Sequence, residues 1–102
     1  MGVRAQRFDL NLPVWYRATS ETEWHVGVTE TVSSTGALIR VEESVPPAQP
    51  VHLVIALPSA AGCLIGTGRI VRTVETDRHP ATFAIGVGHF HIRSKAVLKR
   101  IA

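Results

Sequence analysis

Residues 24–42, WHVGVTETVSSTGALIRVE, predict two β-strands joined by a short turn. Apolar side chains fall at alternate positions in the first half, as at Trp24, Val26 and Val28, which is the period of two expected for a strand with one buried face. Residues 33–36, SSTG, are small and polar and favour a turn. Residues 37–42, ALIRVE, then resume the strand pattern, so this part of the chain indicates β-structure.

Strand-like segments also flank this stretch on both sides. They are predicted at residues 12–19, 51–57, 63–75 and 82–92, and polar, proline-rich or glycine-containing turns separate them. At the C-terminal end, Ser94 is a suitable helix cap, and apolar residues at helical spacing predict a short helix over residues 94–101. Six strands followed by one helix predict an all-β fold, a six-stranded antiparallel β-barrel with a short C-terminal α-helix.

The length of 102 residues predicts a single domain over residues 1–102, since no linker or repeat divides the chain. Residues 1–11 carry two arginines and are expected to form a flexible N-terminal segment. Cys63 is the only cysteine, so no internal disulfide is expected. The apolar stretches, such as residues 51–57, are too short to cross a bilayer, and no signal peptide is recognised. A cytoplasmic protein without membrane insertion is therefore expected.

The sequence offers no arrangement of residues typical of an enzyme. Both aspartates, Asp9 and Asp77, fall in predicted connections, and the doubled glycines at 66–68 and 86–88 do not continue into a dinucleotide-binding motif. His89 and His91 would share one face of a strand, but a metal site needs at least one further ligand. We therefore predict neither catalytic activity nor a bound metal or cofactor.

The basic residues are almost all arginines. Of eleven Lys and Arg residues only Lys95 and Lys99 are lysines, while the net charge is only +3. The arginine side chain suits bidentate recognition of phosphates and of guanine edges. An excess of charge this small does not predict binding to DNA or RNA, for which a basic stripe would be expected. It is compatible with a small anionic ligand.

Two short elements together resemble the PilZ domain, the bacterial receptor module for cyclic di-GMP. The first is Arg4 and Arg7 ahead of residues 8–14, and the second is residues 31–36, TVSSTG. The family pairs an N-terminal R-x-x-x-R with a [D/N]-x-S-x-x-G turn between two barrel strands. The proline-rich loop, the segments 68–72 and 84–90 and the terminal helix follow in matching order, so the resemblance covers nearly the whole chain.

The resemblance implies the same barrel with a C-terminal helix and a cyclic di-GMP site made by Arg4, Arg7, Thr31, Ser33 and Gly36. The arginines would fork onto phosphate or guanine, the hydroxyls would contact guanine, and the glycine would shape the turn. Arg69 and Arg72 would lie on opposite strand faces, so at most one of them could contribute.

The chain departs from the family pattern in both halves of the site. Arg4 and Arg7 are three positions apart rather than four, and Thr31 stands where the family has Asp or Asn. A hydroxyl cannot accept two guanine N–H groups as a carboxylate does, and the loss of such a charge-assisted acceptor costs about 1.5–3 kcal/mol. The predicted function is thus a cyclic di-GMP receptor or adaptor of weakened affinity.

Two other functions remain open at this point. A degenerate PilZ barrel would not bind the nucleotide and would act through protein–protein contacts, with a partner that the sequence does not identify. A different small barrel would bind an oligonucleotide, although that function favours aromatic residues interleaved with arginine on one exposed face.

Overall fold

The structure, a computed structural model, describes residues 6–41, 50–58, 61–74 and 81–101. Strands occupy most of this part of the chain. In chain order they are β1 (Phe8–Asp9), β2 (Pro13–Ala18), β3 (His25–Ser33), β4 (Gly36–Val41), β5 (Pro50–Ala56), β6 (Cys63–Val74), β7 (Ala81–Val87) and β8 (His91–Arg93).

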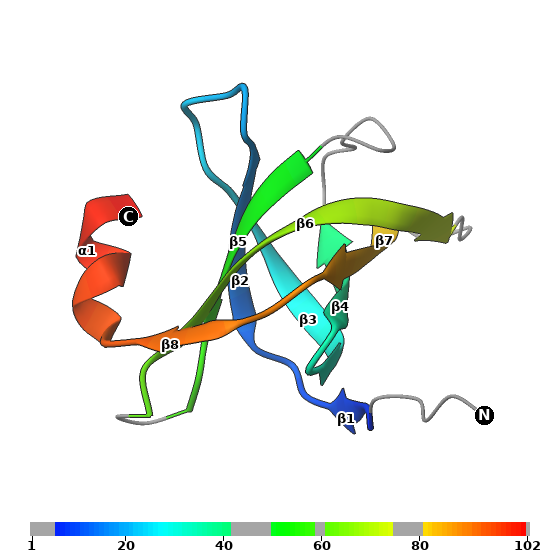
Figure 1. Cartoon of the computed structure of the whole chain (residues 1–102), viewed down its shortest axis with the longest axis horizontal. Helices are drawn as coiled ribbons and strands as arrows, with labels where there is room; N and C mark the ends of the chain where they lie inside the picture. The colour runs from blue at the N-terminus through cyan, green and yellow to red at the C-terminus, as the bar shows by residue number, and fades with distance from the viewer. Residues whose placement is uncertain (1–5, 42–49, 59–60, 75–80, 102) are drawn as a thin grey trace.

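The strands β2 to β7 form one closed antiparallel barrel (Figure 1). The order of neighbours is β3-β2-β5-β6-β7-β4, and pairing of β4 with β3 closes the ring. The two shortest strands extend it, β1 along β3 and β8 along β6. The predicted six-stranded antiparallel barrel is therefore confirmed.

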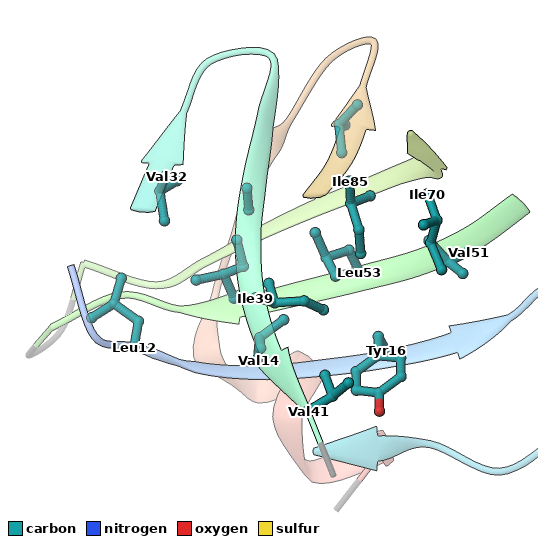
Figure 2. Close-up of a cluster of buried hydrophobic side chains, with 13 residues drawn as sticks. Leu12, Val14, Tyr16, Val32, Ile39, Val41, Val51, Leu53, Ile70 and Ile85 are labelled. Carbon is teal, nitrogen blue, oxygen red and sulfur yellow. The ribbon is translucent and has the colours of Figure 1, made fainter. Parts of the chain in front are cut away.

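Apolar side chains from the barrel strands fill the interior (Figure 2). Every second residue of a strand points inward, so each strand contributes an alternating set to one cluster. Its buried members are Leu12, Val14, Tyr16, Val32, Ala37, Ile39, Val41, Val51, Leu53, Ile55, Ile70, Ile85 and Val87. Because these side chains occupy the interior of a narrow barrel, a ligand has to bind on its outside or at its ends.

The inward-facing residues of β3 differ from those that the alternation suggests. Val26 and Val28 are 60% and 44% exposed, whereas Gly27 and Thr29 are buried. A Cβ atom at Gly27 would lie 2.6 Å from the carbonyl oxygen of Arg40, so the inward position has no room for a side chain. A register shift between Thr29 and Thr31 reverses the phase, and Val32 points inward again.

The last predicted strand is two strands. β7 and β8 are separated by residues 88–90, and both pair with β6. After β8 the chain forms a 3₁₀ turn, Lys95–Val97, and one turn of helix, α1 (Leu98–Ile101), with the Ser94 hydroxyl accepting from the Ala96 amide at 3.1 Å. The short C-terminal helix is thus confirmed. In the described part of the chain, no helix is long and apolar enough to cross a membrane.

Candidate functional site

The turn between β3 and β4 is held by its own serine. The Ser33 hydroxyl donates to the carbonyl of Gly36 and accepts from the amide of Thr35, each at 3.3 Å. The amide of Val87 donates to the Thr35 carbonyl at 2.8 Å, which fixes the turn against the end of β7. Ser33 therefore has a local structural role in addition to the ligand contact predicted for it.

Gly36 is required by close contact between β4 and β7. A Cβ atom at this position would lie 2.3 Å from the carbonyl oxygen of Ile85, a separation that real side chains do not reach. The role of this motif glycine in the structure is therefore close backbone approach, one of the two reasons for which such a position favours glycine. A larger residue at Gly36 would push β4 away from β7 and open the turn.

The residues before β2 lie along β3 and bring Arg7 to the turn. In this N-terminal arm, defined here as residues 6–12, β1 pairs with β3 so that Phe8 faces Val32 and Asp9 faces Thr31. Figure 1 shows β1 at the end of the barrel where β3 turns into β4. The pairing places the start of the arm beside the Ser33 turn, although the two segments are far apart in the sequence.

A buried threonine attaches the arm to β3. The Thr29 hydroxyl donates to the Leu10 carbonyl and accepts from the Leu12 amide at 2.9 Å, while the Thr29 amide donates to the Leu12 carbonyl at 2.9 Å. The Asn11 side-chain amide also donates to the Thr29 carbonyl at 3.0 Å. Thr29 is fully buried, and its four hydrogen bonds to residues 10–12 fix the path of the arm ahead of β2.

These elements enclose a pocket of about 150 Å³, called the turn pocket below. Its polar lining comes from Arg7 of the arm and from Thr31, Ser33 and Thr35 of the β3–β4 turn. Its remaining lining is apolar or backbone, namely Gly36, Ala37, Leu38, Val71, Ile85 and Gly86. The structure thus brings together four of the five predicted site residues, and the fifth, Arg4, lies outside the described residues.

The lining of the turn pocket suits an anion that carries a flat ring. Arg7 is exposed and makes no ion pair with the described residues, so its guanidinium is available to a phosphate or a guanine edge. The apolar floor can pack against the face of a base, and the hydroxyls can bond to its edge. A volume of 150 Å³ is below the roughly 300 Å³ of the smallest typical small-molecule sites, so this pocket by itself has room for only part of a drug-sized ligand.

A second, wider hollow adjoins the turn pocket. It measures about 510 Å³ and shares Thr35, Val71 and Gly86 with its neighbour. Its other lining residues are Pro50, Thr67, Gly68, Arg69, Val87 and Gly88. We call it the glycine-lined hollow. Of the two arginines of β6 considered as possible ligand contacts, Arg69 lines the glycine-lined hollow. The side chain of Arg72 is outside the described part of the structure.

Sequence reasoning did not identify the residues that join the two hollows. Val71 is 69% exposed because a register shift between Ile70 and Arg72 interrupts the ladder of β6 with β7. The available signal was the pair of doubled glycines at 66–68 and 86–88. Glycine in a strand permits close approach of the facing backbone, as at Gly68, where a Cβ atom would lie 2.2 Å from the carbonyl oxygen of Gly86.

The remaining titratable residues form no metal centre in the described part of the chain, where no group of three His, Cys, Asp or Glu residues comes together. The rings of His89 and His91 meet edge to face with centroids 4.8 Å apart. His52 bonds instead to the Thr67 hydroxyl at 3.0 Å. Cys63 is buried, and this burial raises the pKa of its thiol.

Comparison with known proteins agrees with this geometry. Residues 3–101 match the family model of the PilZ domain. The fold is similar to the solved structure of the Bacillus subtilis inhibitor of motility MotI/DgrA, with a TM-score of 0.68 over 99% of this chain and 12% identity. This chain spans 48% of the length of that protein, and no curated protein matches its sequence.

The closed six-stranded barrel is the fold expected of a PilZ-type module, and the match over residues 3–101 identifies the family. The chain belongs to the PilZ domain family. The predicted resemblance is therefore confirmed. The likeness to the motility inhibitor, at 12% identity, concerns the fold alone.

Proposed function

We propose that this chain is a non-catalytic receptor or adaptor module that binds cyclic di-GMP at the turn pocket. The observation that supports it is the convergence of Arg7, Thr31 and Ser33, from two separate segments, on one pocket in a member of the PilZ family. Each segment corresponds to one half of the family's motif pair. Their contact through the β1–β3 pairing supports a single binding surface formed by both segments.

The ligand offers two phosphates and two guanine bases, and the pocket offers a partner for each kind of group. The Arg7 guanidinium would form a bidentate pair with a phosphate or with guanine O6 and N7. The hydroxyls of Thr31 and Ser33 would bond to the edge of a base that rests on the apolar floor. Arg4, three residues before Arg7 in the sequence, would assist.

The affinity is expected to be modest, because Thr31 replaces a stronger acceptor at the first position of the turn motif. The proposed module also has no catalytic activity, so the bound nucleotide should be released without chemical change. It would act through a protein partner or a further domain, in response to the ligand.

Calorimetric titration with cyclic di-GMP at physiological salt tests this proposal. Arg7→Ala should weaken binding by about 10- to 100-fold, because a charge-assisted pair is lost, and Ser33→Ala should weaken it by less than about tenfold. Arg100→Ala is the matched control, since this arginine is exposed on α1 and lines neither hollow.

Negligible effects of both Arg7→Ala and Ser33→Ala would contradict the assignment of the turn pocket. No binding by the unaltered protein would contradict the receptor function and would favour the barrel that acts through protein contacts alone. Chromatography of the nucleotide after incubation, with and without divalent metal, checks the absence of turnover. A hydrolysed product above the buffer control would contradict the non-catalytic role.

A further inference from the structure

The turn pocket lacks a carboxylate in its lining, but one stands next to it on the neighbouring strand. In the antiparallel ladder of β1 with β3, Asp9 lies directly opposite Thr31. Directly opposed residues project their side chains from the same face of a sheet, with Cβ atoms about 4.5–5.5 Å apart. The Asp9 carboxylate therefore shares the outer face with the hydroxyl that stands at the acceptor position of the family motif.

The same alternation relates Asp9 to the other site residues. Side chains two positions apart on a strand project from the same face. Arg7 and Asp9 therefore share a face of the arm, and Thr31 and Ser33 share a face of β3. Three of these four residues line the turn pocket, and Asp9 adjoins it at Thr31.

The Asp9 side chain is free to meet a ligand. It is exposed and forms no hydrogen bond or ion pair with the described residues. Its position is nevertheless defined, because its own strand pairs with β3 and the Thr29 hydrogen bonds hold residues 10–12 directly after it. A carboxylate on a strand whose backbone is fixed, with no partner among the described residues, is suited to accept hydrogen bonds from donors of a ligand.

We propose that Asp9 supplies from β1 the acceptor that Thr31 does not supply from β3. Its two carboxylate oxygens would accept hydrogen bonds from N1–H and the exocyclic N2 amino group of one guanine, while Arg7 holds a phosphate or the O6 and N7 edge. Asp9 is then the residue that selects guanine. This inference rests on the proposed binding of cyclic di-GMP.

The sign of the effect makes the test specific. The ligand is an anion, so removing a carboxylate near it should by charge alone strengthen binding. If Asp9 bonds to guanine, Asp9→Ala should instead weaken binding of cyclic di-GMP by about 10- to 100-fold in calorimetry. Glu23→Ala, at an exposed carboxylate in the turn before β3, is the matched control and should change affinity by less than about threefold.

A second ligand separates recognition of guanine from a merely structural role. Cyclic di-IMP lacks the N2 amino group, so the unaltered protein should bind it about tenfold or more weakly than cyclic di-GMP, and Asp9→Ala should lose this preference. If Asp9 had only a structural role, Asp9→Ala would weaken the binding of both ligands equally. Relocating the carboxylate in the double variant Asp9→Ala/Thr31→Asp should restore both the affinity and the preference.

The outcomes distinguish this inference from the function on which it rests. If Arg7→Ala weakens binding but Asp9→Ala behaves like Glu23→Ala, the role of Asp9 is wrong and the receptor function stands. Equal loss of both ligands in Asp9→Ala, without rescue by Thr31→Asp, also overturns it. If the unaltered protein binds no cyclic di-GMP, the receptor function and the role of Asp9 are both refuted.

Discussion

Replacing Thr29 by valine tests whether one hydroxyl holds the N-terminal arm on the barrel. Valine has nearly the shape of threonine and suits a strand, so the change removes the hydrogen bonds of the side chain and little else. The Leu12 amide, a buried donor, would lose its acceptor, and the Leu10 carbonyl would lose its donor. The hydrogen bonds of the Thr29 backbone, to the Leu12 carbonyl and from the Asn11 side chain, would remain.

The energetic cost follows from these contacts. A buried amide without a partner costs about 1–3 kcal/mol, and the second hydrogen bond contributes about 0.5–1.5 kcal/mol. The additional buried methyl group of valine offsets about 0.8 kcal/mol. We expect the free energy of unfolding to fall by about 1–3 kcal/mol and Tm to fall by about 5–20 °C.

Amide hydrogen exchange measured by NMR gives the decisive readout, because it reports on the arm itself. In Thr29→Val the Leu12 amide should lose protection, and the pairing of Asp9 with Thr31 should weaken with it. Thr29→Ser keeps the hydroxyl and loses a methyl group, so it should lose some stability but retain protection of the Leu12 amide. Full protection of that amide in Thr29→Val, or equal loss in Thr29→Ser, would refute the argument.

Three further predictions concern the rest of the barrel. Gly68→Ala should lower the free energy of unfolding by about 1–3 kcal/mol or more in chemical denaturation, because its Cβ would meet the facing strand at 2.2 Å, whereas Gly88→Ala, with nothing within 4 Å, should stay within about 0.5 kcal/mol of the unaltered protein. The Cys63 thiol, with its pKa raised by burial, should react with iodoacetamide much more slowly at pH 8 in the folded than in the unfolded protein; equal rates would contradict its burial. Arg40→Ala should cost less than about 1 kcal/mol in the same denaturation assay, because its ion pair with Glu30 is exposed to solvent, and a larger loss would contradict that reasoning.

The sequence was sufficient to predict the barrel because its signals are local. Alternating apolar residues specify a strand wherever it lies, and prolines, glycines and small polar residues specify the ends. The same local character made the turn at Ser33 and Gly36 recognisable. The six-stranded barrel was also expected from the family resemblance, and the pairing of β4 with both β3 and β7 confirms it.

The direction of side chains was harder to predict, because it depends on neighbouring strands. The alternation around Val26 and Val28 correctly indicated a strand, but it could not show that Gly27 and Thr29 occupy the inward positions. That choice is set by the close approach of β4, whose backbone leaves no space for a side chain at Gly27. The register shift after Thr29 then restores Val32 to the core, and a shift of one residue reverses every side chain that follows it.

The candidate site shows the same limit at the level of function. In the sequence, Asp9 lies in a predicted connection, and Thr31 is recognised only as a departure from the [D/N]-x-S-x-x-G motif. The segment that follows Asp9 is hydrogen-bonded to Thr29, a residue that the alternation gives no reason to single out. A departure from a family pattern at one strand position is therefore incomplete information in a β-barrel. The residue across the ladder projects from the same face of the sheet, so the chemistry of such a position depends on the cross-strand pair, here Asp9 with Thr31. With Asp9 in its proposed role, the loss in affinity expected from Thr31 alone is an upper bound.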